Sequence, residues 1–233
     1  MAVTFVGGAS AHTTNGANVT ITLPTSLQND VVYVFGGFSR TATPGVSTSG
    51  YTNLVDVING TLCHLYVGRK IMGATPDTSV TCLGSGNAQD ATAYTAMVFR
   101  GEDTTTPEDA TTTTANAATG NPDPPSITTV TNGAWVLAIG LSAGNNATIT
   151  GPSGYSNLNT SQDTDTRPIN AMGATKEITT AGAENPGAYS GLPSNSVCSA
   201  SVAIRPAASS VVMTEATFRD PFVQSKATFN IPF

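Results

Sequence analysis

The chain has 233 residues and a formal net charge of −6, and only 10% of its residues are charged. Hydrophobic residues make up 39%, enough for a packed core, which excludes a disordered chain. The charged fraction is well below the roughly 25% of an average soluble domain. Much of the remainder is Thr, which favours strands, and Gly, Pro and Asn, which favour turns, so the composition predicts an all-β fold.

The nine basic residues are scattered, and only Arg69 and Lys70 are adjacent. A nucleic-acid partner requires a clustered basic surface, so we expect no nucleic-acid binding. No apolar run approaches the roughly 18 residues that span a bilayer, and the first residues lack the features of a signal peptide. We therefore expect neither membrane association nor secretion.

The three cysteines, Cys63, Cys82 and Cys198, contain no Cys-x-x-Cys spacing. This usage is typical of a chain made in a reducing compartment, in which thiols act as small buried side chains. We expect free thiols, with a disulfide as the open alternative.

Short apolar runs between turn residues predict strands along most of the chain. The sequence Asn59-Gly60 separates two such runs, and Asn-Gly is the strongest short-range signal for a β-hairpin. Residues 31–38 and 134–141 are apolar at nearly every position, which is typical of strands covered on both faces. The expected strands are 3–6, 19–23, 31–38, 53–58, 61–67, 78–83, 91–99, 127–131, 134–141 and 197–204.

Three short motifs recur in the same order at a nearly constant offset. The sequence SGYTNL at 49–54 returns as SGYSNL at 153–158, GFS at 37–39 as GLS at 140–142, and MVFR at 97–100 as VAIR at 202–205. Residues 30–101 and 133–206 are therefore interpreted as two copies of one unit, joined by a polar linker without regular structure at 102–125. We expect one jelly-roll-like antiparallel β-sandwich over 1–206, each copy contributing half; two tandem sandwiches are the alternative.

Residues 207–233 differ in character and are predicted to form an extended arm. A spacer of small residues is followed by a segment rich in Phe. Such side chains are poorly stable in water, so we expect the arm to bind a neighbouring subunit, or alternatively to pair with its own sheets. The predicted partner-binding residues are Phe218, Phe222, Phe229 and Phe233.

Candidate catalytic and metal-binding motifs are weak. Residues 140–144 match the G-x-S-x-G nucleophile elbow at Ser142, but the residues that follow cannot form the helix which that motif requires, and both histidines, His12 and His64, precede the serine. His64 and Cys63 are adjacent and would face opposite sides of a strand, so they cannot chelate one ion together. We predict no catalytic, cofactor or metal site.

Three aromatic residues could in principle stack on a sugar, as in a carbohydrate-binding module. Trp135 shares a strand face with core residues, and Tyr51 and Tyr155 occupy equivalent repeat positions. We expect all three to serve packing, and carbohydrate binding remains an alternative.

The order of these motifs (an Asn/Asp turn into an apolar strand, SGYT, a TSVTC strand, then FRGED and TTTP) resembles a β-sandwich module of tailed-bacteriophage virion proteins. The resemblance covers residues 1–206. It implies a non-enzymatic capsid decoration (cement) protein on the virion surface, made in the host cytoplasm without a cofactor. The implied partners are the major capsid protein or other virion proteins, and the implied state is a trimer or dimer. A tail or fibre component that contacts the host surface is the alternative within the same particle.

Overall fold

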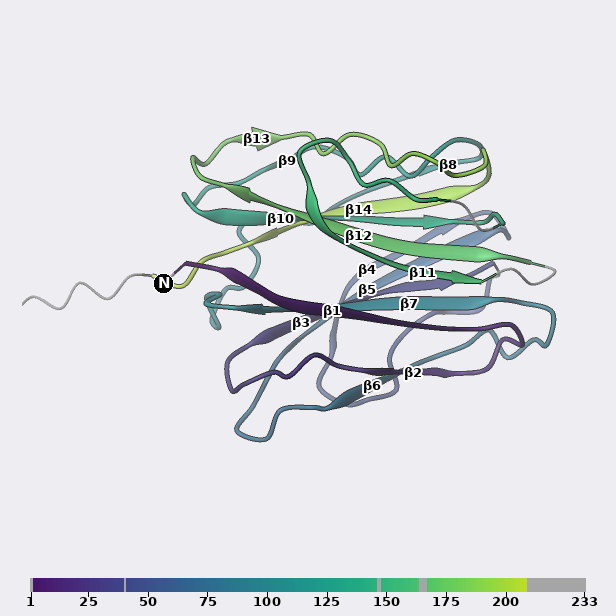
Figure 1. The fold of residues 1–233 in the computed structure, drawn as a ribbon, viewed down its shortest axis with the longest axis horizontal. Coiled ribbons are helices and arrows are strands. Elements are labelled where there is room, and N and C mark those ends of the chain that lie inside the picture. The colour runs from purple at the N-terminus through teal and green to yellow at the C-terminus, as the bar shows by residue number, and fades with distance from the viewer. Residues whose placement is uncertain (1, 40, 146–147, 164–166, 209–233) are drawn as a thin grey trace, which may run out of the picture.

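The computed structural model describes residues 2–39, 41–145, 148–163 and 167–208 (Figure 1). Every regular element within these ranges is a β-strand, and all strand pairs are antiparallel. The predicted all-β class is therefore confirmed.

The chain forms two five-stranded sheets and two two-stranded ones. The first large sheet has the order β1 (Thr4–Thr13), β7 (Thr92–Arg100), β3 (Val31–Phe38), β5 (Cys63–Ile71), β4 (Thr52–Asn59). The second has the order β8 (Thr113–Ala117), β14 (Val197–Ile204), β10 (Ala134–Ser142), β12 (Ile169–Ile178), β11 (Ser156–Asp163). The small sheets pair β2 (Val19–Thr22) with β6 (Ser79–Cys82), and β9 (Ile127–Thr128) with β13 (Ala183–Glu184).

Strands β8 to β14 thus repeat the topology of β1 to β7. In each half the first strand lies beside the last, and the second and sixth strands pair in a separate layer. The third, fourth and fifth strands of each half lie in its large sheet, so each half combines a five-stranded sheet with a separate two-stranded pair. The predicted internal repeat is confirmed, and it extends over the whole described body.

The predicted linker at 102–125 is wrong in one respect, because it contains β8, which pairs with β14 from Val197↔Ala117 to Ser201↔Thr113. The second half therefore begins near residue 113 rather than 133. The prediction failed because β8 is a short edge strand of Thr, Ala and Asn, whose sequence carries no hydrophobic alternation.

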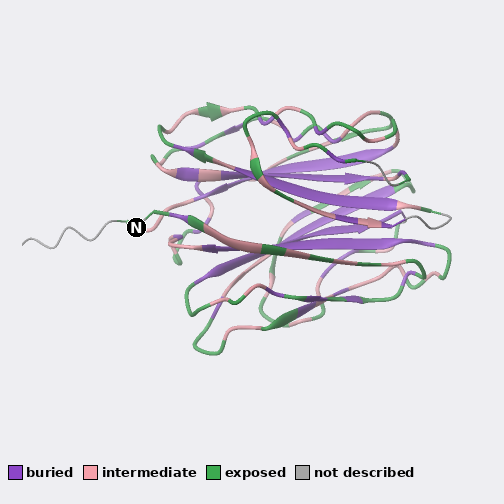
Figure 2. Ribbon diagram, viewed as in Figure 1, coloured by how far each residue is buried: buried purple, intermediate pink, exposed green. Residues whose placement is uncertain are grey.

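The sheets stack in four layers, with the two large sheets in the middle (Figure 1). Their facing sides share one core, to which the first half contributes Tyr33 and Phe35 and the second half Leu137 and Ile139. Figure 2 shows that the central strands are mostly buried, whereas exposed residues concentrate in the loops and the outer layers. The two large sheets thus form a central sandwich, with each repeat supplying one of them.

The outer layers explain why β3 and β10 are apolar at nearly every position. Val32 and Val34 point away from the central core and pack with Val19 and Ile21 of the β2–β6 pair. On the other side, β9 contributes Ile127 to a cluster that also contains Val136 and Ala203. Both faces of each central strand are thus covered, as the sequence predicts.

The halves meet across a pseudo-two-fold axis. Edge strand β1 lies against β11, and its counterpart β8 lies against β4, the counterpart of β11. Side chains join each pair of edges: Ser161 donates to the Ala11 carbonyl at 2.8 Å, and Asn59 donates to the Ala117 carbonyl at 2.6 Å. Repetition of the same contact on both sides is the signature of an isologous dimer, here contained in one chain.

Candidate functional site

The four phenylalanines of the predicted arm, Phe218, Phe222, Phe229 and Phe233, lie outside the described residues. The point where the arm begins is described. Pro206 forms a β-bridge with Glu102, and the Ala207 amide donates to the Gly101 carbonyl at 2.8 Å. The N-terminus lies at the same end of the sandwich (Figure 1), which we call the terminal end.

Two clefts open at the terminal end, and Ala207 lines both. The first terminal cleft, of about 390 Å³, is lined by residues 27–30, 100–102, 104 and 207. The second, of about 340 Å³, is lined by residues 2, 131–133 and 206–208. The Asn29 and Gly133 amides donate to equivalent carbonyls, those of Met72 and Ile178, at 2.9 Å each, so the clefts are counterparts in the two halves.

The first terminal cleft is charged. Arg100 donates two hydrogen bonds to Asp30, from Nε at 2.8 Å and from Nη2 at 2.7 Å, while the Leu27 amide donates to the same carboxylate at 2.7 Å. Glu102 is 3% exposed and accepts a 3.5 Å hydrogen bond from the Tyr33 hydroxyl. Burial, and then the nearby Glu108, raise the pKa of Glu102 well above its usual range. Its carboxyl group is thereby biased towards the neutral form.

The second terminal cleft has no charged side chain in its lining. Asp109 holds the loop that includes residues 130–133 beside this cleft. Its fully buried carboxylate accepts hydrogen bonds from the amides of Val130 at 2.6 Å and Thr131 at 3.0 Å. Arg205 lies 3.3 Å from the other oxygen of Asp109. The two clefts therefore share a backbone frame and differ in electrostatics.

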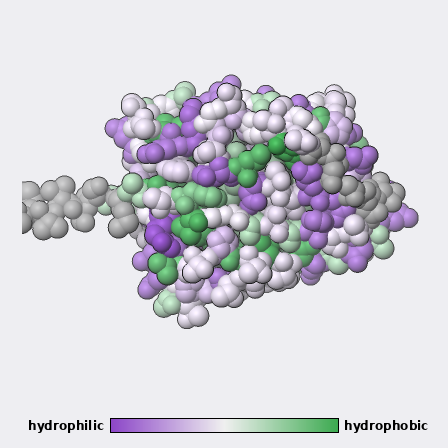
Figure 3. All heavy atoms as spheres, viewed as in Figure 1, coloured by the Kyte–Doolittle hydropathy of each residue, from purple (hydrophilic) through white to green (hydrophobic). Residues whose placement is uncertain are grey.

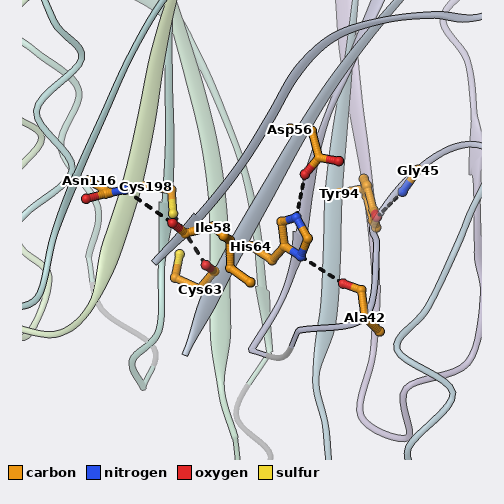
Figure 4. A network of polar contacts seen from close by, with 9 residues as sticks. All are labelled: Ala42, Gly45, Asp56, Ile58, Cys63, His64, Tyr94, Asn116 and Cys198. Carbon is orange, nitrogen blue, oxygen red and sulfur yellow. Dashed lines mark hydrogen bonds and ion pairs between the residues drawn. The ribbon is translucent and has the colours of Figure 1, made fainter. Parts of the chain in front are cut away.

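Ser142 of the G-x-S-x-G motif is fully buried at the opposite end of the sandwich. Beside it opens a cleft of about 430 Å³ whose lining includes Ser39, Asn145 and Arg167. His64 contacts the Asp56 carboxylate through Nε2 and the Ala42 carbonyl through Nδ1 at 2.8 Å (Figure 4). The imidazole thus joins the edge strand β4 to the loop that contains Ala42.

Cys63 and His64 point to opposite faces of β5, as predicted. Cys63 lies in the central core with Cys198 of β14, whose thiol contacts the Cys63 carbonyl at 3.5 Å (Figure 4). All three cysteines are free and buried, which confirms that expectation. In the described part of the chain, no three His, Cys, Asp or Glu side chains gather as metal ligands would.

Tyr51 and Tyr155 occupy equivalent sites, as the repeat predicts. A lysine ammonium lies over each ring, Lys70 at 5.5 Å and Lys176 at 5.8 Å from the ring centre. Each lysine is also bound to a carboxylate of its own half, Asp77 at 2.6 Å and Glu184 at 2.9 Å. Both rings pack against the outer clusters.

Sequence reasoning missed the lysines and carboxylates of these two groups. The available signal was the offset: Lys176 follows Lys70 by nearly the same interval that separates the two tyrosines. Trp135 packs against the central core with its ring edge-on to Phe99, at 6.1 Å between ring centres, as predicted.

Exposed aliphatic side chains are few in the described structure. On the face in Figure 3, apolar residues form small groups between polar and neutral ones. The exposed large aliphatics are Leu27, Ile58, Leu62, Val130 and Leu158. Leu27 lines the first terminal cleft, and Val130 directly precedes the lining of the second.

Comparison with protein-family models, with curated proteins and with solved structures finds no match for this chain. Among the described residues there is no helix of the length and apolarity that a membrane crossing requires.

Proposed function

We propose that this protein is a non-enzymatic structural component of a bacteriophage virion, a capsid decoration protein that binds the outer face of the shell. The body acts as a rigid block, and the Phe-rich arm acts as the clamp that attaches it to neighbouring subunits. The major capsid protein is the proposed partner.

The observation that carries this proposal is the duplicated sandwich, whose edge strands lie against each other and whose last described residues, at one end, precede the Phe-rich segment of the sequence. The two large sheets share one core, and their edges bond to each other through Ser161 and Asn59. Closed edges suppress unwanted strand pairing, and a continuous core supplies stability without a cofactor. Both properties suit a protein that must persist on a particle outside the cell.

The scarcity of charged side chains supports the same role. Only 10% of residues are charged, and several of these side chains already form ion pairs within the body, including Lys70–Asp77 and Lys176–Glu184. Long charged side chains lose rotamer entropy when surfaces pack together, and that cost is small here. Carbohydrate binding is disfavoured, because Tyr51 and Tyr155 already hold a lysine over the ring and pack against the body.

Cryo-electron microscopy of purified particles tests the location directly. We expect density for the sandwich on the outside of the head, at junctions between capsid subunits. Density confined to the tail or fibres would refute the decoration role and support the alternative within the virion.

The role of the arm is tested by replacing Phe218, Phe222, Phe229 and Phe233 with Ala in the full chain. We expect loss of binding to undecorated heads with an unchanged melting temperature of the sandwich. Unchanged binding would show that the clamp lies in the body.

A glycan array tests the alternative of carbohydrate binding, with the intact chain and the Tyr51→Ala and Tyr155→Ala variants as probes. We expect no signal from any of them.

A further inference from the structure

The last 22 residues contain a second, shorter repeat. Residues 212–222, VMTEATFRDPF, align with residues 223–233, VQSKATFNIPF, and share Val, Ala, Thr, Phe, Pro and Phe at the same positions. Each copy ends in the pattern A-T-F-x-x-P-F. Residues 212–233 of the arm are therefore two consecutive copies of one motif.

The body offers two equivalent places at the end from which the arm leaves. The terminal clefts are counterparts in the two halves, they meet at Ala207, and each lies beside an exposed aliphatic side chain. Leu27 is 54% exposed and Val130 is 65% exposed. Exposed aliphatic side chains beside a cleft are typical of a surface that a partner covers.

We propose that the two motifs of the arm bind the two terminal clefts of a second copy of this chain, one motif in each cleft. This inference rests on the proposed role of the arm as a clamp and names what the clamp holds. Two motifs on one peptide bind two sites on one surface with a gain from effective concentration, provided that the linker spans them. Consecutive motifs lie eleven residues apart, a reach of up to about 36 Å when extended, and the clefts share a wall.

Charge assigns each motif to its cleft. The first motif carries Arg219 and Asp220 between its two phenylalanines, and the first terminal cleft presents the Arg100 guanidinium, 41% exposed, which is complementary to Asp220. The second motif carries Asn230 and Ile231 at the same positions, and the second terminal cleft is lined without a charged residue. The charged motif thus matches the charged cleft, and the uncharged positions match the neutral one.

A second copy is favoured over the arm's own body by the sequence between the body and the first motif. Residues 211–217 contain no Gly, Pro, Asn, Asp or Ser, which are the residues that tight reversals use. If extended, the eight residue steps from Ser210 to Phe218 would carry the first phenylalanine up to about 26 Å from the end of the cleft wall that Ala208 helps to form. Such head-to-tail contacts either close into a ring or continue as a chain of copies.

Mixing two full-length variants tests the proposal. One carries Ala in place of all four arm phenylalanines and keeps the clefts; the other carries Leu27→Asp and Val130→Asp and keeps the arm. In sedimentation equilibrium the wild type self-associates, each variant alone is monomeric, and the mixture forms a one-to-one heterodimer. Leu158→Asp, at a side chain 42% exposed on β11, is the matched control and self-associates like the wild type.

Single-motif variants test the pairing of motif and cleft. We expect Ala at Phe218 and Phe222 to raise the dissociation constant at least about tenfold, the loss typical of one interface anchor. Adding Leu27→Asp to that variant should raise the dissociation constant little further, because the contact with the first terminal cleft is already lost. Adding Val130→Asp should raise it by a second factor of similar size, because the contact with the second terminal cleft is then lost as well.

A wild-type chain that stays monomeric at about 100 μM, where interfaces of even micromolar affinity are populated, overturns the proposal, as does a mixture of variants that stays monomeric. A monomeric chain that still binds heads through its phenylalanines overturns this inference and leaves the proposed decoration role intact. A chain that self-associates through the arm but is absent from the head shell supports this inference and overturns the proposed decoration role.

Discussion

The contact between the two halves is most tightly constrained where Phe35 of β3 meets Gly173 of β12. A methyl group placed on Gly173 would lie 2.3 Å from the tip of the Phe35 ring and 3.3 Å from the terminal methyl of Met97. All three residues are buried, so the ring has little free space into which it can move. The substitution Gly173→Ala therefore inserts one carbon into a filled core.

We expect Gly173→Ala to lower the free energy of unfolding by about 1–3 kcal/mol, the usual cost of an extra methyl group in a packed core. Phe35→Leu shortens the side chain that the methyl group meets. The double variant should therefore lose less stability than the sum of the single variants, with a coupling of about 1 kcal/mol or more.

Urea denaturation followed by Trp135 fluorescence measures these values. Gly73→Ala and Gly182→Ala are the controls, because a methyl group at either position meets no atom within 4 Å. Equal stability of Gly173→Ala and the controls, or additive effects of Gly173→Ala and Phe35→Leu, would refute the packing that we describe between the halves.

Three further predictions concern buried polar groups. Folding raises the pKa of Glu102, so the folded chain keeps this proton at pH values above 4.5, where the unfolded chain loses it. Stability therefore falls as the pH rises, by at most about 1.4 kcal/mol per pH unit. Glu102→Gln should remove this slope in urea titrations at pH 5 to 8, and an unchanged slope would contradict the assignment. Asp109→Ala removes the carboxylate that binds two amides and a guanidinium, and should lower the free energy of unfolding by about 2–4 kcal/mol in the same assay. Asp123→Ala, at an exposed residue, should leave the free energy of unfolding almost unchanged. A thiol reagent such as dithionitrobenzoate should react slowly with the native chain and fully in urea, because all three cysteines are buried and burial raises the pKa of the Cys63 and Cys82 thiols. Rapid labelling of the native chain would show that the core opens at Cys63, Cys82 or Cys198.

The fold class and the repeat could be predicted because each depends on local chemistry. The Asn59-Gly60 turn does join β4 to β5, with Gly60 at φ 58°, and the wholly apolar runs are the central strands β3 and β10. The repeated Tyr motif led to equivalent packing positions for the same reason.

Register could not be read from the motifs alone. The matching triplets at 37–39 and 140–142 imply that Gly37 corresponds to Gly140, yet the strand ladders align Gly36 with Gly140. Gly36 pairs with Tyr66 and Tyr94, whereas Gly140 pairs with Met172 and Ser199, which are the counterparts of those tyrosines. A one-residue difference in register depends on pairing partners far away in sequence.

The terminal clefts were also beyond sequence reasoning. Asp30, Arg100 and Glu102 were visible as charged residues near strand ends, but their convergence depends on which strands become neighbours. The difference in charge between the two clefts arises because Asp30 has its structural counterpart in Ala134. The sequence offered no reason to compare these two positions before the ladders were known.

Joining the two halves in one polypeptide has a consequence for how the molecule can change. In a dimer of identical chains, every substitution occurs twice and must suit both copies of the contact. In this chain, Phe35 lies against Gly173, while their counterparts in the opposite halves are Ile139 and Val67. One contact thus joins an aromatic ring to a glycine, whereas the equivalent contact joins two aliphatic side chains of medium size. Because the halves are fused in one chain, the two contacts need not be identical and can change independently.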